Sequence, residues 1–210
     1  MAPRPKATPE SMAMAAMLMI DELGLEQLTA RGLAARMGVS TAPIYRLWSG
    51  IDELVAAAVL VASADLAMFA AQHETDNPYL NTSLGIVRYA REHPNLYRAM
   101  FLERSAVAPV LESFITLLDE LLKGSQHTRA LATSEIRRAI LREVWMYTHG
   151  LASLIATGNM TLTQEADLRH TLESVSAAIV KSKVVQQAQQ RKGSSVLAWA
   201  QQMAQENEQE

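Results

Sequence analysis

The sequence contains no cysteine among its 210 residues, which excludes disulfides, thiolate metal sites and cysteine nucleophiles. Aromatic residues make up only 5% of the chain, and runs of β-branched residues are few. Hydrophobic residues nevertheless reach 49%, with alanine, leucine and methionine abundant. This composition favours an all-α protein with a well-filled core over a disordered or β-rich chain.

An excess of positive charge is also missing, because the formal net charge is −3. Any binding to nucleic acid must therefore come from the local placement of basic side chains. The apolar stretch 12–20 is short and is followed by Asp21 and Glu22, so we interpret it as a core helix, neither a signal peptide nor a membrane span. We expect a cytoplasmic protein without a membrane partner.

Signatures of catalysis are absent as well. The five histidines show no HExxH-type spacing, and there is no glycine-rich phosphate loop and no GxSxG motif. We therefore expect no enzyme, no metal site and no cofactor. A small helical enzyme remains an alternative, because acidic side chains could meet a histidine in three dimensions.

The stretch TARGLAARMGVSTAPIY, residues 29–45, predicts two short helices joined by a tight turn. Ala34 is small enough to let a second helix approach, and Gly38 can adopt the left-handed backbone that ends the first. Ser40 is expected to cap the second helix, over about 40–48. The pattern fits a DNA-binding helix-turn-helix, and it also fits an ordinary αα-hairpin within a bundle.

The wider run GLEQLTARGLAARMGVSTAPIYRLWSGIDELV, residues 24–55, resembles the N-terminal domain of the TetR (tetracycline-repressor-like) family. Two later stretches, EHPNLYRAMF (92–101) and WMYTHGLASL (145–154), are similar to the ligand-binding half of a TetR subgroup with a Trp and His-Gly signature. The positions that carry the N-terminal resemblance are Gly24, Thr29, Leu33, Ala34, Gly38, Val39, Ser40, Ile44, Tyr45, Trp48 and Leu54.

The resemblance implies a one-component transcriptional regulator, usually a repressor, that binds a palindromic DNA operator as a homodimer. Arg31 corresponds to a base-contacting position in some members, although it could equally be an ordinary surface side chain. Ile51 departs from the family, which usually has lysine there, and residues 1–60 carry a net charge of −1. The DNA-contacting residues implied are Thr29, Arg31, Ser40, Thr41, Ala42, Pro43, Tyr45 and Arg46.

The same resemblance implies that the second half encloses a small-molecule effector. Trp145 and His149 lie one helical turn apart, giving an apolar wall and a switchable polar group, which suits a hydrophobic or aromatic effector. The alternative is that these residues are ordinary core and that His149 is a core histidine with its hydrogen bonds satisfied. The candidate ligand-binding residues are Tyr97, Met100, Phe101, Leu118, Trp145 and His149.

The helix expected over 133–157 is apolar on two faces, so that one face needs a second cover. A matching stripe on the next helix, over 163–182, predicts a four-helix interface between two copies. A larger monomeric bundle is the alternative. The predicted interface residues are Val144, Leu151, Leu154, Leu168, Leu172, Val175 and Ile179.

The expected organisation has four parts. A flexible arm (1–9) precedes the helix-turn-helix DNA-binding domain (10–55), and a helix over 50–72 connects this domain to a ligand-binding and dimerisation domain (56–182). A Gln-rich tail (183–210) follows, with a possible short helix around Val196, Trp199 and Met203. A helical ligand carrier with a degenerate DNA-binding head is the principal rival to a regulator. The other helices are expected over 10–23, 29–37, 78–92, 94–104 and 107–123.

Overall fold

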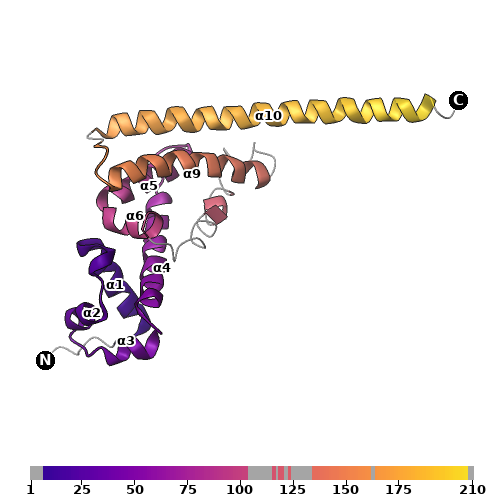
Figure 1. The fold of residues 1–210 in the computed structure, drawn as a ribbon. Helices are drawn as coiled ribbons and strands as arrows, with labels where there is room; N and C mark the ends of the chain where they lie inside the picture. Colours follow the sequence, from indigo (N-terminus) through magenta and orange to yellow (C-terminus); the bar gives the residue numbers. More distant parts are fainter. Residues whose placement is uncertain are drawn as a thin grey trace.

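The computed structural model describes residues 7–103, 115–116, 118–120, 123, 134–161 and 164–207, with side chains of the last helix described up to residue 189. All regular structure within these residues is helical, which confirms the all-α prediction. Helices α1, α2 and α3 form a small head at one end of the molecule (Figure 1). Helix α4 runs from this head into a body made of α5, α6, α9 and α10.

The head begins with α1 (Pro9–Leu23), which Thr8 starts through a capping box with Ser11 and which Gly24 ends at φ 88°. A 3-10 turn, η1 (Leu25–Gln27), leads into α2 (Ala30–Met37). Thr29 caps α2 as predicted, because its Oγ1 accepts a hydrogen bond from the Gly32 N–H at 3.0 Å. Gly38 has φ 65° and ψ 31°, the left-handed conformation expected where α2 ends.

Helix α3 (Ala42–Leu47) is shorter than the expected 40–48, and Ser40 does not cap it. The residue at the N-cap is Thr41, whose φ of −73° and ψ of −16° are already helical, and no side chain caps this end. Pro43, within the first turn, has no N–H and so leaves one donor fewer to be satisfied.

In the body, two of the expected helices begin at a proline, whose missing N–H costs little in the first turn. Helix α5 spans Pro78–Glu92, α6 spans Pro94–Phe101 and α9 spans Ser134–Ala156. The expected helix over 107–123 lies outside the described residues except for short helical pieces at 115–116, 118–120 and 123.

Of the described helices, α4 (Ile51–Ala70) alone is long and apolar enough by composition to cross a membrane. Core helices of soluble proteins share this property. The side of α4 that carries Leu54, Ala58, Ala62 and Leu66 is buried, and the helix packs against α1, α5 and α6. We therefore interpret α4 as a core helix.

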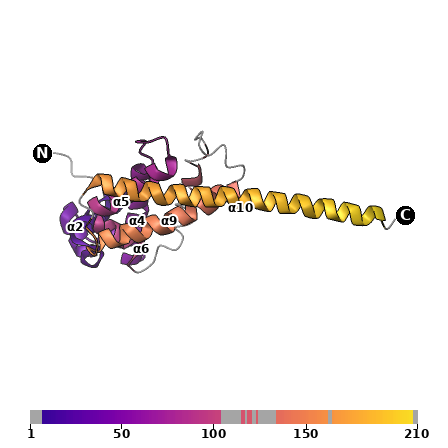
Figure 2. The same ribbon diagram turned by 90° about the horizontal axis from the view of Figure 1, so that it is seen from above.

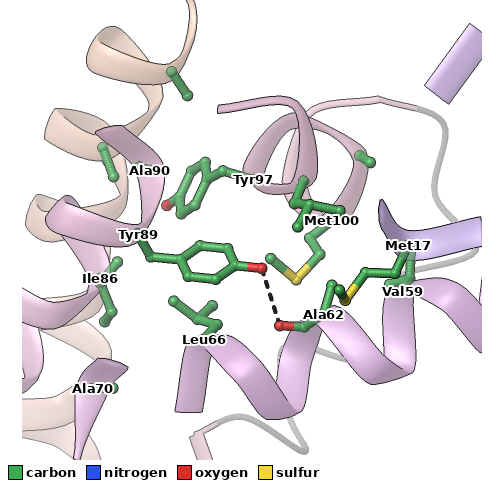
Figure 3. Packing of buried hydrophobic residues seen from close by; sticks show 14 of the residues in the cluster. Met17, Val59, Ala62, Leu66, Ala70, Ile86, Tyr89, Ala90, Tyr97 and Met100 are labelled. Atoms are coloured by element: carbon green, nitrogen blue, oxygen red, sulfur yellow. Dashed lines mark hydrogen bonds between the residues drawn. The ribbon is translucent and has the colours of Figure 1, made fainter. Parts of the chain in front are cut away.

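The contact between α4 and α5 depends on Gly85, where the two backbones approach closely. A Cβ atom at Gly85 would lie 2.1 Å from the main-chain oxygen of Phe69, far inside van der Waals contact. Tyr89, one turn further along α5, donates a hydrogen bond from its hydroxyl to the Ala62 main-chain oxygen at 3.3 Å (Figure 3). These contacts set the position of the connecting helix on the body.

Helix α10 (Glu165–Asn207) is longer than the expected 163–182 helix and continues through the region where a separate short helix was expected. Alanine, glutamine, lysine and arginine favour helix throughout this region, which explains the continuity. Helix α10 lies along α9, where Lys183 pairs with Glu143, and then projects beyond the body (Figures 1 and 2).

Candidate nucleic-acid interface and aromatic cluster

The outer face of the head carries the residues predicted to contact DNA. Tyr45 is 63% exposed, and its side chain is one of the most exposed large hydrophobic groups described. Thr29, Arg31, Ser40, Ala42 and Arg46 are also exposed, whereas Thr41 and Pro43 are half-buried. All eight residues thus lie at the surface, with none of them enclosed by the body.

The charges of the head are distributed unevenly between ion pairs and free groups. Arg36 forms a bidentate pair with Glu22, at 2.6 and 2.5 Å, and this hydrogen bond holds the pKa of the Glu22 carboxyl below its usual value. Within the described residues, Arg31 and Arg46 have no acidic partner. Residues 1–60 thus carry a net charge of −1, yet Arg31 on α2 and Arg46 on α3 are exposed and have no acidic partner among the described residues.

The interior of the head holds α2 and α3 in a fixed relation. Leu33 and Ala34 on α2, Ile44 on α3 and Trp48 after it are all buried and belong to one hydrophobic core. The Val39 N–H donates to the Ala34 main-chain oxygen at 3.0 Å, so the turn is hydrogen bonded as well as packed. Ile44 thus anchors α3 in the core of the head, while the side of α3 that carries Tyr45 and Arg46 is exposed.

Four of the six predicted ligand-binding residues meet in one aromatic cluster between α6 and α9. The rings of Trp145 and His149 stack, with centroids 5.3 Å apart and planes 12° apart. Phe101 contacts both, at 5.2 and 5.6 Å between centroids, and Tyr97 lies 4.9 Å from Phe101. We refer to Tyr97, Phe101, Trp145 and His149 as the aromatic cluster.

A hydrogen bond joins the two helices at this cluster, with 2.7 Å between the Tyr97 hydroxyl and Nδ1 of His149. Burial lowers the pKa of His149 and raises the pKa of Tyr97, so both side chains are uncharged at neutral pH. Met100 and Leu118, the other two predicted residues, are fully buried in the hydrophobic core, and Figure 3 shows Met100 near Tyr89.

A second junction, which the sequence did not predict, joins the head to the body. Nδ1 of His93 lies 2.8 Å from a carboxylate oxygen of Asp21, and the Asn95 side-chain amide donates to the Asp21 main-chain oxygen at 2.7 Å. His93 also packs against the rings of Phe69 and Tyr89. We call Asp21, His93 and Asn95 the α1–α6 junction.

The seven residues predicted to form a dimer interface are placed unevenly in the single chain. Val144, Leu168 and Leu172 are buried within the single chain, where α9 packs against α5, α6 and α10. Leu151, Val175 and Ile179 are half-buried, and Leu154 is exposed. The exposed side chains of α9 include Met146 and Tyr147, which the interface prediction omitted.

Among the described residues, no group of three or more acidic or histidine side chains is placed to hold a metal ion. Basic and acidic side chains instead form ion pairs that fasten the body. Arg88 pairs with both Glu74 and Glu165, and Arg169 reaches Glu74 at 2.8 Å, which ties the start of α10 to α5.

Comparison with known proteins found a family model for part of the body and a solved structure with a similar fold. Residues 81–179 match the family model for the tetracyclin repressor-like C-terminal domain. A search of curated protein sequences found no match. A TetR variant from Acinetobacter baumannii AYE, crystallised in complex with minocycline, shares the fold with a TM-score of 0.61 and 18% identity, over 85% of this chain and 99% of that one. Residues 81–179 thus resemble a tetracyclin repressor-like C-terminal domain, and the likeness to the Acinetobacter protein extends the shared fold over most of the chain.

Proposed function

We propose that this protein is a ligand-responsive transcriptional regulator, acting as a repressor that binds a palindromic operator as a homodimer and leaves it when a small effector binds. The observation that carries the proposal is the exposure of Arg31 on α2 and of Tyr45 and Arg46 on α3, with neither arginine paired to an acidic side chain among the described residues. Unpaired guanidinium groups and hydroxyls on an exposed surface suit phosphate and base-edge contacts.

Dimerisation is supported by the exposed side of α9 and α10. On α9, the exposed residues Tyr147, Gly150 and Leu154 recur at helical spacing. On α10, Ser174 and Ala178 are exposed and small, which allows a second pair of helices to approach closely. These positions replace the buried Val144, Leu168 and Leu172 as the proposed contact face. Cytoplasmic localisation follows from a role on DNA.

The aromatic cluster favours the binding of an apolar or aromatic effector, because the rings of Phe101, Trp145 and Tyr97 lie around His149. An effector that inserts between α6 and α9 would compete with the hydrogen bond between Tyr97 and His149. Binding would then favour a conformation in which α6 has moved.

Helix α6 links this event to the head. Its eight residues carry Tyr97 and Phe101 of the aromatic cluster, and its first turn carries Asn95 of the α1–α6 junction. A shift of α6 would therefore change how α1 is held. A coupling free energy of about 1–3 kcal/mol between the two sites would change operator affinity by roughly 5- to 150-fold.

A gel-shift assay with random-sequence duplexes at low salt tests the proposal. A regulator shifts the duplexes, and the shift weakens steeply as salt rises because phosphate contacts release counterions. A helical ligand carrier with a degenerate head does not shift DNA. A double variant with Arg31→Ala and Arg46→Ala should lose the shift, whereas Arg142→Ala, an exposed arginine on α9, should keep it.

A further inference from the structure

Tyr79, in the first turn of α5, has a buried hydroxyl that no described residue satisfies. The residue is 3% exposed, and its hydroxyl is, within the described part of the chain, the one buried side-chain oxygen or nitrogen without a hydrogen-bond partner. A buried hydroxyl without a partner costs about 1–3 kcal/mol, so proteins rarely retain one that has no use. The hydroxyl is therefore a candidate contact for a bound molecule.

Charged side chains beside Tyr79 indicate the chemistry of such a molecule. Asp119 is 1% exposed and accepts hydrogen bonds from Nε of Arg137 and of Arg138, at 3.2 and 3.3 Å. Two guanidinium groups thus face one carboxylate, which leaves an excess of one positive charge. The side chain of Arg137 is itself mostly buried, whereas that of Arg138 extends toward solvent.

The charges of Arg137 and Asp119 act on the Tyr79 hydroxyl with unequal strength. Burial raises the pKa of Tyr79 to about 12, and of the two nearby charges Arg137 acts more strongly than Asp119. The phenol therefore remains protonated and available as a donor at neutral pH. Because the positive charge of Arg137 acts on the hydroxyl more strongly than the negative charge of Asp119, the two together favour an anionic acceptor there.

This polar end lies in line with the aromatic cluster. On α9, Arg137, Leu141, Trp145 and His149 follow one another at intervals of four residues, with Leu141 and Trp145 buried. Eight residues of helix separate Arg137 from Trp145, a distance of about 12 Å. The Thr148 hydroxyl of α9 donates a buried hydrogen bond at 3.0 Å to the hydroxyl of Ser83, one turn beyond Tyr79 on α5, so the two helices are also in polar contact here.

We propose that the Tyr79 hydroxyl and the Arg137 guanidinium bind the anionic group of the effector, whose apolar body extends to the aromatic cluster. The effector class is then an amphipathic acid, with its carboxylate or similar anion about 12 Å from the far end of its apolar part. This inference rests on the proposed effector-binding function and narrows it.

Decanoate and decanol are suitable probes, because they share an apolar chain and differ in the charge of the head group. Isothermal titration of the full chain should show decanoate binding at least about tenfold more tightly than decanol, since a hydrogen bond to a charged group is worth that factor or more. Tyr79→Phe should lower the affinity for decanoate about tenfold and leave that for decanol unchanged.

Tyr89→Phe is the matched control, because it removes a buried hydroxyl whose partner is a main-chain oxygen. This variant should keep the preference for decanoate. Arg137→Gln should abolish the preference, and circular dichroism would establish whether that variant is folded. If it is unfolded, Tyr79→Phe alone decides the inference.

Equal affinities for decanoate and decanol, or no binding of either, would overturn the inference. A preference that Tyr79→Phe does not alter would also overturn it, and would indicate that a buried water satisfies the hydroxyl. DNA binding, measured separately by gel shift, distinguishes the two levels of the proposal. If the protein shifts DNA but does not prefer decanoate, only the anion-binding inference is overturned. If it prefers decanoate but does not shift DNA, the proposed regulatory function is overturned.

Discussion

Nδ1 of His93 lies 2.8 Å from the Asp21 carboxylate, so that the last turn of α1 in the head is held by the residue that joins α5 to α6 in the body. Asn95 adds a hydrogen bond to the Asp21 main-chain oxygen at 2.7 Å. The head is thus fastened to the body at a second place besides α4, and this second place shares a helix with the aromatic cluster.

Asn95→Ala should loosen this fastening without unfolding the protein. Amide hydrogens in the last turn of α1 and in η1 should exchange faster, because opening of the head away from α6 becomes easier. Hydrogen exchange read by mass spectrometry measures this change. Asn159→Ala, which removes an exposed local hydrogen bond to Thr157, should leave these amides unchanged. The same exchange rates in both variants would contradict a fastening role for Asn95.

The DNA-contacting residues should separate into two classes. Tyr45→Phe, which removes only a hydroxyl from a side chain that is largely exposed, should weaken binding to all DNA sequences alike because it removes a phosphate contact. Arg31→Ala should instead relax the preference at particular base pairs, with a cost of about 1–3 kcal/mol on the preferred site. Fluorescence anisotropy on specific and random duplexes measures both effects. Equal losses on the two duplexes for Arg31→Ala would remove its role in base readout.

The stability of the protein should fall as pH decreases below about 6.5, partly because of His149. Burial lowers the pKa of His149 in the folded state, so below the ordinary value of 6.5 the unfolded chain takes up a proton that the folded chain does not. The free energy of unfolding therefore decreases from about pH 6.5 down to the lowered pKa. Urea denaturation at pH 7.5 and 5.5 should show a smaller loss in His149→Gln than in the unsubstituted protein. An identical loss in both would contradict a neutral, buried His149.

Gly85→Ala should destabilise the protein. The sign of the change in the free energy of unfolding tests whether α4 and α5 are in backbone contact. Because the added Cβ would lie 2.1 Å from the Phe69 main-chain oxygen, α4 and α5 would have to separate, at a cost of about 1–3 kcal/mol in the free energy of unfolding. Without that close approach, alanine would stabilise a helical position by about 0.4–1 kcal/mol. Denaturant unfolding distinguishes the two, and an increase in stability would show that the two helices are not in backbone contact.

Local signals made much of the fold predictable from the sequence. Pro78 and Pro94 mark the first residues of α5 and α6, and Thr29 caps α2 because a threonine hydroxyl can reach the exposed N–H groups of a helix. Gly38 ends α2 for a similarly local reason, its freedom to adopt a positive φ. The one-turn spacing of Trp145 and His149 likewise predicted half of the aromatic cluster.

Features that depend on long-range packing were not predictable in this way. The pairs Asp21–His93 and Asp119–Arg137 join residues far apart in sequence or on different helices, and only the packing of those helices brings them together. The burial of Leu168 and Leu172 within one chain has the same origin, because an apolar stripe does not reveal which neighbour covers it. The sequence likewise does not distinguish Tyr79 from an ordinary core tyrosine; only the structure shows that its hydroxyl has no partner among the residues described.

The central claim is that two copies of α3, held apart by paired bodies, read two half-sites of one operator. Selection of bound duplexes from a random DNA pool by the full-length protein tests it most directly. The account predicts enrichment of an inverted repeat whose half-site centres are one helical turn, roughly 34–36 Å, or a multiple of it apart, with two chains on each duplex. Failure to enrich any sequence, or enrichment of a single half-site bound by one chain, would contradict it.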